Sequence, residues 1–334
     1  MKQIIDPFQR KINYLRLSVT DRCDFRCQYC MPEKMKFLPK KDILSLEELY
    51  KLCSCFISMG IKKIRITGGE PLVRKDIIKL FWRLSPFIEN KHLKELTLTT
   101  NGSQLSKYAY ELYDTGVRRI NISMDTLKPD KFKKITRTGD LDNVLKGIKI
   151  AKKVGFKIKI NTVALKNIND DELHDLINWC GNEGFDITFI EVMPMGSFED
   201  RNRLGQYWSL KDLKKEVEKK WNLINVPLNT GGPAKYSKIL QTEQNIGFIS
   251  PLSNNFCENC NRIRITCKGE LFTCLGQNGV TDLKPAIRNP GKNNHLLVKS
   301  IENSISKKPK GHDFNYDDNA LKGKLDRFMS HTGG

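Results

Sequence analysis

Three cysteines near the start of the chain have a spacing that suits a metal or iron–sulfur centre. Cys23, Cys27 and Cys30 are four and three residues apart and follow a strand-like run at residues 15–19. Three thiolates this close in sequence can converge on one soft metal centre. Zinc would need a fourth ligand, and none lies nearby, whereas a cubane cluster with three cysteine ligands keeps one iron open. A redox or zinc Cys-x-x-Cys site is the simpler alternative.

A second group of three cysteines lies in the last third of the chain. Its members are Cys257, Cys260 and Cys274. The spacing also fits half of a zinc ribbon. Arg262 and Arg264 alternate with isoleucines between these cysteines, so a strand here would point both guanidinium groups to one face. A solvent-facing edge strand often carries such charges. Beside a thiolate cluster and facing a cavity, they would instead suit an anionic substrate.

The length and composition narrow the class of protein. The 334 residues can form one large α/β domain and a smaller one. We expect a cytoplasmic protein, since there is neither a signal-like N-terminus nor an apolar run of membrane-spanning length. Ten cysteines then favour metal ligation over disulfides. Cys53, Cys55 and Cys180 fall in helix-like segments and are predicted to be small core residues.

The net charge of +19 raises the question of a polyanionic partner. The lysines are scattered along helix-like segments among isoleucine and asparagine. They are not interleaved with aromatic residues as in a groove that binds a nucleic-acid strand. We therefore expect no nucleic acid and no membrane among the partners.

A recurring pattern of helix, glycine and apolar strand must position these groups. Helical segments end in glycine and are followed by strands, which is typical of βα units. The expected strands cover residues 15–19, 61–67, 93–99, 117–123, 156–161 and 185–190. Six such units predict a parallel sheet with right-handed crossovers, in an open, partial (βα)6 barrel of the TIM type. Residues 1–228 would form this barrel, and residues 229–334 a smaller C-terminal cluster-binding and substrate region.

Polar motifs follow each expected strand, where a parallel βα barrel has its active site. They are Cys23 to Cys30, residues 67–71, 99–102, 123–125, 161–162 and 191–194. Gly68-Gly69 is either a tight turn or a close approach of the backbone to a ligand. After residue 200 we expect helices at 210–221 and 321–329, and exposed loops at 289–294 and 306–311.

These motifs resemble a known superfamily. The pattern Cys-x3-Cys-x-Tyr-Cys, ending in Tyr29 and Cys30, together with Gly68-Gly69-Glu70-Pro71, is similar to the signature of the radical S-adenosylmethionine (SAM) enzymes. Over nearly the whole chain, the order and spacing of the motifs resemble the GTP 3′,8-cyclases, the molybdenum cofactor biosynthesis protein A family. The further motifs that carry this resemblance are residues 15–23, 64–72, 99–102, 120–125, 260–264 and the terminal Gly333-Gly334.

The resemblance implies roles for individual residues. It implies that Cys23, Cys27 and Cys30 bind the SAM [4Fe–4S] cluster and that Tyr29, Gly69, Ser123 and Met193 line SAM. It implies a second [4Fe–4S] cluster on Cys257, Cys260 and Cys274. It implies contacts with GTP from Arg16, Arg65, Thr99, Lys159, Arg262, Ile263 and Arg264, of which residues 262–264 act as a segment. Arg16, Arg262, Arg264, Gly333 and Gly334 would be the catalytic residues, with the tail reaching the active site.

The implied reaction is the first step of molybdenum cofactor biosynthesis. One electron from an external donor would lead to a 5′-deoxyadenosyl radical, which takes the ribose 3′-hydrogen of GTP. The resulting carbon radical would add to guanine C8, and a downstream cyclic pyranopterin monophosphate synthase would use the product. The oligomeric state stays open, a homodimer included. The chain has no P-loop motif, so side chains must hold the triphosphate.

Two departures from the family pattern matter. Thr188 stands where the family usually has an arginine, so a phosphate contact is lost or is supplied by another base. Cys267 stands where a small non-ligating residue is usual, and it lies between Cys260 and Cys274. We expect Cys267 to be a bystander, because it precedes a hairpin-turn signal and would point away from the cluster.

Two alternatives stay open from the sequence. A radical SAM peptide maturase also carries auxiliary clusters, but its substrate does not require the Arg-Ile-Arg segment or the Gly-Gly tail. A non-enzymatic iron–sulfur carrier or a zinc-dependent RNA-binding module would not need six polar loops at one face of a barrel.

Overall fold

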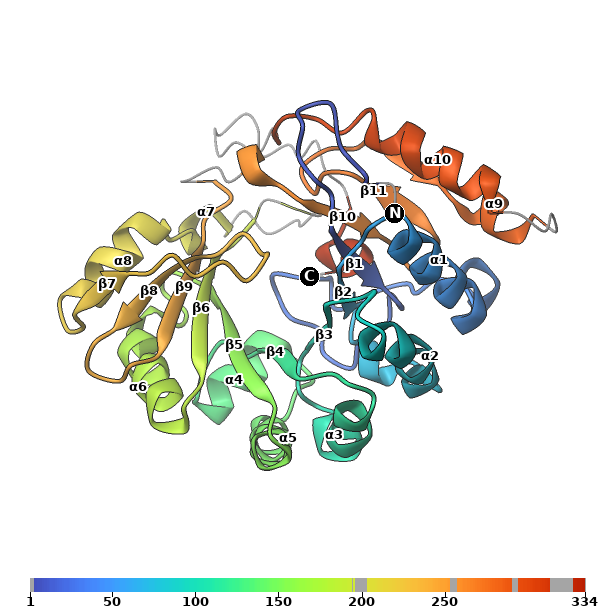
Figure 1. The fold of residues 1–334 in the computed structure, drawn as a ribbon. Helices are drawn as coiled ribbons and strands as arrows, with labels where there is room; N and C mark the ends of the chain where they lie inside the picture. Colours follow the sequence, from blue (N-terminus) through green and yellow to red (C-terminus); the bar gives the residue numbers. More distant parts are fainter. Residues whose placement is uncertain are drawn as a thin grey trace.

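One curved sheet of twelve strands organises the molecule in this computed structural model (Figure 1). The structure describes residues 3–193, 195, 203–252, 257–289, 294–312 and 327–333. The strand order is β12-β11-β10-β1-β2-β3-β4-β5-β6-β9-β8-β7. The strands are β1 (Tyr14–Ser18), β2 (Lys63–Thr67), β3 (Glu95–Thr100), β4 (Arg119–Ser123), β5 (Lys157–Ala164), β6 (Asp186–Glu191), β7 (Leu223–Asn225), β8 (Lys235–Ile239), β9 (Asn245–Ile249), β10 (Arg262–Ile265), β11 (Glu270–Phe272) and β12 (Val280–Asp282).

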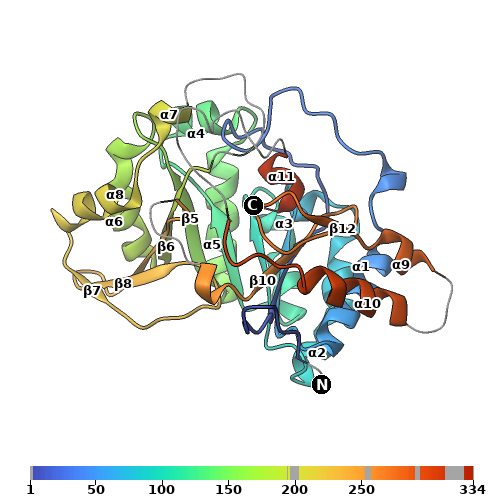
Figure 2. The same ribbon diagram turned by 90° about the horizontal axis from the view of Figure 1, so that it is seen from above.

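Most of the helices lie on the convex side of the sheet, whereas the short C-terminal helix α11 (Met329–Thr332) lies inside its curve (Figures 1 and 2). The helices are α1 (Leu46–Ser58), α2 (Ile77–Glu89), α3 (Leu105–Asp114), α4 (Pro129–Thr136), α5 (Leu141–Val154), α6 (Leu173–Glu183), α7 (Arg203–Gln206), α8 (Leu210–Glu218), α9 (Lys284–Arg288), α10 (His295–Ile305) and α11 (Met329–Thr332). Local signals set their ends. Ser45 and Glu48 form a capping box at the start of α1. Gly155 and Gly184, at φ of 103° and 73°, end α5 and α6 in a conformation that favours glycine.

The two faces of the central strands differ in chemistry. Leucine, isoleucine and phenylalanine side chains such as Leu15, Ile64 and Phe189 alternate with polar ones and join the hydrophobic core. The polar set occupies the other positions of each strand and faces the concave side, which we call the lumen. Because successive side chains of a strand point to opposite faces, this alternation separates a core under the helices from a polar interior.

The predicted partial barrel is confirmed. Six parallel strands, β1 to β6, lie where the sequence predicted them, and neighbouring strands pair in parallel register. The C-terminal part of the chain continues the same sheet on both sides, because β10 pairs with β1 and β9 pairs with β6. The division at residue 228 stays a prediction.

Other predicted elements fall close to their expected places. The helix predicted at 210–221 is α8 (Leu210–Glu218). The helix predicted at 321–329 falls largely outside the described residues, and α11 begins at Met329. The segment predicted as an exposed loop at 306–311 contains Lys308, which is only 2% exposed. Over the described ranges, no helix has the length and apolar character needed to cross a bilayer.

Candidate active site

The first cysteine loop lies beyond the carboxyl end of β1 and is fastened to the end of α4. The backbone amides of Arg26 and Gln28 donate to the carbonyl oxygens of Thr136 and Ile135 at 2.9 and 3.0 Å. Phe25, inside the loop, packs edge-to-face on Phe132 with ring centroids 5.8 Å apart. These contacts fix the backbone between the cysteines, so the three thiols have defined positions.

The surroundings of the thiols suit a cluster ligand set. The Phe25 amide and the Asn101 side-chain amide donate to the Cys23 sulfur at 3.4 and 3.8 Å. Burial raises the pKa of the Cys23 and Cys27 thiols, so a bound cation is needed to keep them as thiolates. No three His, Cys, Asp or Glu side chains of the described residues gather as around a single ion. A [4Fe–4S] cluster does not require this, because each cysteine binds a different iron.

Asp24 fastens the loop to the end of β3, the second strand from β1 in the sheet. Asn101 donates to one Asp24 oxygen at 2.7 Å and the Ser103 hydroxyl donates to the other at 2.6 Å. The sequence predicted a polar loop at 99–102 but no partner for it. The structure supplies that partner, since Asn101 also reaches the sulfur of Cys23.

Tyr29, a predicted SAM contact, is held by a carboxylate for which no separate role was predicted. Its hydroxyl donates to Asp125 at 2.7 Å, and Asp125 also accepts from the Val163 amide at 2.8 Å. Burial raises the pKa of Asp125 to about 6. The pair links the cysteine loop to the ends of β4 and β5. Its signal in the sequence is an acidic residue directly after a strand at the active-site edge.

The Gly-Gly-Glu-Pro segment lies against the backbone after β1. The Gly69 amide donates to the carbonyl of Thr20 at 2.8 Å, and a Cβ at Gly69 would meet the carbonyl oxygen of Arg22 at 2.1 Å. Only glycine fits this approach. Because the Gly69 N–H already donates to Thr20, the backbone group of Gly69 that can bind a ligand is its carbonyl oxygen. This acceptor suits the ammonium group of SAM.

Ser123 and Met193 complete the predicted SAM set. Ser123 ends β4 and lies in register with Asn161 of β5, while Met193 follows β6 by two residues. The Asn161 side-chain oxygen is buried and has no hydrogen-bond partner among the described residues. A buried acceptor without a partner is costly, so this site fits a ligand that brings a donor.

The lumen carries a dense set of cations. Arg16 is in register with Arg264 on one side and Arg65 on the other, so three guanidinium groups share one level of the sheet. Arg65 donates to Thr99 at 3.3 Å, which brings together two predicted GTP contacts. Lysine and arginine side chains from five strands contribute to the set: Arg16, Lys63, Arg65, Arg119, Lys159, Arg262 and Arg264.

Lys63 and Arg119 belong to this set although neither is among the residues predicted to contact GTP. Lys63 is only 8% exposed and pairs with Glu95 at 2.9 Å, and Arg119 pairs with the same carboxylate at 2.5 Å. Lys63 also donates to the Thr230 carbonyl at 2.6 Å. The signal was the spacing, because Lys63 lies two residues before Arg65 and therefore faces the same way.

Two pKa values show how strong the positive field in the lumen is. Burial raises the pKa of Tyr14, but Arg65, Arg16, Lys63 and Arg262 outweigh it and lower the value to about 7. Burial, reinforced by Arg65 and Arg119, lowers the pKa of Lys159 to about 7. A field that favours the phenolate form of tyrosine and opposes the ammonium form of lysine will also attract a multiply charged anion.

The C-terminal tail enters the lumen, where the views agree in placing the C-terminus inside the curve of the sheet (Figures 1 and 2). Arg264 donates to the Gly333 carbonyl at 2.6 Å, and Arg16 to the same oxygen at 3.4 Å. Gly333 has a φ of 75°, and a Cβ there would meet the Thr67 hydroxyl at 2.1 Å. Gly334 lies outside the described residues.

The second cysteine group forms at the opposite end of the lumen, around the amino end of β10. Cys257 and Cys260 precede β10, and the antiparallel pairing of Arg264 with Phe272 returns the chain so that Cys274 lies beside them. Burial raises the pKa of the Cys260 thiol, but Arg262 and Lys308 outweigh it and lower the value to about 7. A thiol that ionises readily is a good iron ligand.

Cys267 follows the carboxyl end of β10, so the strand separates it from Cys260. Seven residues of extended chain span roughly 20 Å. Cys267 is 1% exposed, its carbonyl accepts from the Leu44 amide at 2.8 Å, and burial raises its pKa to about 12. Its charged neighbours, Asp21 and Arg74, are not those of the cysteine group. This geometry agrees with the bystander prediction.

Ile263 and Thr188 lie at positions where the family resemblance predicted a ligand contact or its loss. Ile263 is only 1% exposed and its side chain joins the core, so only its backbone can face a ligand in the lumen. Thr188 lies on the lumen side of β6 in register with Gly247, and Gly247 lies against the ring of Tyr236. Tyr236 accepts from Lys159 at 3.0 Å. A lysine–tyrosine pair therefore occupies the neighbourhood of the missing arginine.

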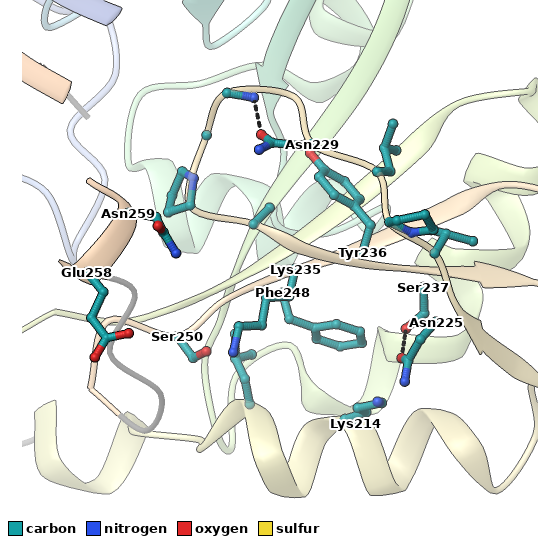
Figure 3. Close-up of a pocket in the computed structure, with 18 of the residues that line it drawn as sticks. Lys214, Asn225, Asn229, Lys235, Tyr236, Ser237, Phe248, Ser250, Glu258 and Asn259 are labelled. Atoms are coloured by element: carbon teal, nitrogen blue, oxygen red, sulfur yellow. Dashed lines mark hydrogen bonds between the residues drawn. The ribbon is translucent and has the colours of Figure 1, made fainter. Parts of the chain in front are cut away.

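A cavity of about 900 Å³ lies between α8, strands β7 to β9 and the segment before β10 (Figure 3). Arg262 and Tyr236 line it, and both also belong to the lumen. Lys211, Lys214 and Lys235 add positive charge, against Glu258 as the acidic residue. The cavity therefore gives the cationic end of the lumen an opening to the side.

Comparison with known proteins decides the family. The sequence profile of the radical SAM superfamily matches residues 17–180, and that of Molybdenum Cofactor Synthesis C matches residues 185–314. The chain is 55% identical over 331 residues to the GTP 3′,8-cyclase of Paracoccus denitrificans (strain Pd 1222), covering 99% of this chain and 96% of that one. It is also 55% identical over 331 residues to the GTP 3′,8-cyclase of Rhizobium etli, covering 99% and 94%. The chain belongs to the GTP 3′,8-cyclase family.

Distant solved structures share the fold of this family member. The crystal structure of Streptococcus suis SuiB bound to S-adenosylmethionine matches with a TM-score of 0.62 at 14% identity, over 96% of this chain and 76% of that chain. At such a low sequence identity, the match supports a shared fold and nothing more. Membership of the radical SAM superfamily implies SAM and a [4Fe–4S] cluster as cofactors. The resemblance seen in the motifs is thereby confirmed.

Proposed function

We propose that this chain converts GTP to (8S)-3′,8-cyclo-7,8-dihydroguanosine 5′-triphosphate, the first step of molybdenum cofactor biosynthesis. The observation that carries the proposal is the lumen. Its cations lie between two cysteine groups at opposite ends of β1 and β10, and the C-terminal tail lies among them. A peptide substrate does not demand such a density of positive charge. A triphosphate does, since this chain has no P-loop to hold it.

Each end of the lumen takes a different part of the chemistry. Cys23, Cys27 and Cys30 would hold the SAM cluster, which with SAM supplies the 5′-deoxyadenosyl radical when bound. Tyr29, positioned by Asp125, and Gly69 would orient SAM at this end. The loop contacts with α4 fix the positions of the half-buried thiols, which matters because a reactive radical must be generated in a defined place and orientation.

The other end would bind the substrate. Lys63, Arg65 and Lys159 would neutralise the triphosphate, and the cavity beside Arg262 would admit it. Cys257, Cys260 and Cys274 would hold a second [4Fe–4S] cluster near guanine. Arg16, Arg264 and Gly333 lie between the two ends, where the ribose must be placed for C3′ to reach C8. Orientation of this kind is a main contribution of the protein.

The partners and setting follow from the same proposal. An external reductant supplies the electron, and a cyclic pyranopterin monophosphate synthase uses the product. All ten cysteines are free, which suits a reducing cytoplasm. A homodimer is compatible with the proposal, and light scattering on the reconstituted protein measures the oligomeric state.

One anaerobic experiment tests the activity. The protein is reconstituted with iron and sulfide and incubated with GTP, SAM and dithionite, and mass spectrometry follows both 5′-deoxyadenosine and the cyclised nucleotide. GTP-dependent formation of both supports the proposal. 5′-Deoxyadenosine without the cyclised nucleotide would point to another radical SAM reaction. Failure to cleave SAM at all would point to a non-enzymatic iron–sulfur carrier.

A further inference from the structure

Lys308 is a buried lysine without a carboxylate partner in the part of the chain that the structure describes. Its side chain belongs to a residue that is 2% exposed, just after α10. The ammonium lies 3.6 Å from the Cys260 sulfur and 3.1 Å from the Arg262 carbonyl, and it also donates to the Thr273 carbonyl. A buried charge is costly unless an anion compensates it. The only group with anionic character among these partners is the sulfur of Cys260.

The residues after Lys308 touch the other two cysteines of the group. The Cys274 thiol donates to the Gly311 carbonyl at 4.0 Å, and the His312 backbone amide hydrogen-bonds to the Cys257 sulfur. Thus one short segment, 308–312, contacts all three cysteines. The cysteines themselves come from two other places in the chain.

Arg10 fastens this segment to the N-terminal part of the molecule. It is 8% exposed and pairs with Asp6 at 2.6 Å. Its guanidinium donates to the carbonyl oxygens of Cys257 at 2.7 Å, Lys310 at 2.8 Å and Pro309 at 2.7 Å. The same cation therefore holds the backbone of one cysteine and the backbone of the segment that carries Lys308.

We propose that Lys308 is a positioning residue for the auxiliary iron–sulfur cluster. Its ammonium holds the Cys260 thiolate and the strands on either side of the cysteine group in place, and its charge favours one-electron reduction of that cluster. The inference rests on the second cluster of the proposed function. A cation close to a cluster ligand stabilises the reduced state, because reduction adds one negative charge.

The test uses the full-length chain carrying Cys27→Ala, so that only the auxiliary cluster gives a signal. Lys308→Met removes the charge and the donors, Lys308→Gln keeps neutral donors, and Lys308→Arg keeps the charge. Lys307→Met is the matched control, because Lys307 is the preceding residue but is exposed. Two readouts are taken: the rate of iron loss to a chelator, and the midpoint potential from an EPR-monitored titration with dithionite.

We expect Lys308→Gln to lower the equilibrium constant for one-electron reduction about tenfold, a shift of about 59 mV. Lys308→Met should lose iron several-fold faster than the control, and Lys308→Arg should restore both properties. The inference is overturned when Lys308→Gln and Lys308→Met match Lys307→Met in both readouts, or when Lys308→Arg is as defective as Lys308→Met. If Lys308→Met retains no iron, that loss supports the positioning role and Lys308→Gln carries the potential measurement.

A separate variant distinguishes failure of the inference from failure of the proposed cluster. Replacing Cys257, Cys260 and Cys274 by alanine should remove about half of the iron from the otherwise unaltered protein. If the iron content stays unchanged, the auxiliary cluster itself is refuted. If the iron falls while the Lys308 variants behave like the control, only the role of Lys308 is refuted.

Discussion

The guanidinium of Arg264 donates to the carbonyl oxygen of Gly333 at 2.6 Å, which joins the penultimate residue of the chain to the lumen side of β10. A terminal glycine is ordinarily a flexible end. Here Gly333 lies among Thr67, Ser18 and two arginines, with no room for a side chain. The tail is therefore part of the wall of the site.

Deleting Gly333 and Gly334 should suppress cyclisation and leave the fold intact. The deletion removes the carbonyl that Arg264 and Arg16 share, and both guanidinium groups then lose their positions. The measurement is product formation by mass spectrometry, with iron content and thermal unfolding as checks. Full cyclisation by the shortened protein would show that the tail is an ordinary flexible end with no role in the reaction.

Cys27→Ala should abolish reductive cleavage of SAM, because two thiolates hold a cubane poorly. About half of the iron should remain, on the second cysteine group. Cys53→Ala is the control, since Cys53 is a fully buried core residue of α1. 5′-Deoxyadenosine formed at the parent rate by Cys27→Ala would show that the first group does not activate SAM.

GTP affinity should depend on pH through Lys159. Its pKa is lowered to about 7, so the free protein loses this charge as the pH rises through 7. Bound phosphates favour the ammonium, so binding takes up a proton and weakens by up to about tenfold per pH unit above 7. Below pH 6 this contribution is constant.

Titration calorimetry at pH 6, 7 and 8 measures this dependence. Lys159→Met should bind GTP more weakly at low pH and lose this part of the slope, while titration of the nucleotide itself is common to both proteins. Arg262→Ala should also weaken GTP binding more than SAM binding, with a loss that shrinks at high salt. Identical slopes for the parent and Lys159→Met would remove Lys159 from the phosphate contacts.

Gly69→Ala should destabilise the protein by about 1–3 kcal/mol or more, because the new methyl group overlaps the Arg22 carbonyl. The strain acts next to Cys23, so iron on the first group should also fall. Gly232→Ala is the control, since the nearest atom to its Cβ is 3.7 Å away. Urea unfolding measures the difference, and equal stability of the two variants would contradict the predicted overlap.

Cys267→Ala should keep the full iron content and the GTP-dependent change in the cluster spectrum. Cys267 and Cys260 lie at opposite ends of β10. Loss of one cluster's iron, or a zinc ion in the parent, would show instead that Cys267 closes the second site with four thiolates.

The fold was largely predictable because each strand carries its own signal. The alternation of Arg262, Ile263 and Arg264 predicts one charged face, and the structure has it. The sequence did not indicate which side chains contact one another across the lumen. Asp125 reaches Tyr29 from the loop after β4, and the register of β2 with β1 brings Lys63 beside the cations of β1.

The burial of Lys308 has no signal in the local sequence. Its segment has the composition of an exposed loop, and a lysine is rarely buried. The reason it is buried lies in Cys260 and Arg10, which are distant in the chain. Long-range partners of this kind leave no periodic trace in a single sequence.

The pairing of β10 with β1 has a consequence for how the protein is made. Asn13 and Asn261, which bond to each other beside these strands, are 248 residues apart in the chain. A ribosome needs roughly 10–50 s to cover that distance at 5–20 residues per second. Throughout that time the nascent β1 has one unpaired edge, which can template association with other chains. A truncated chain that ends before β10 should therefore aggregate. Folding of the full-length chain should depend on chaperones that shield this edge during synthesis.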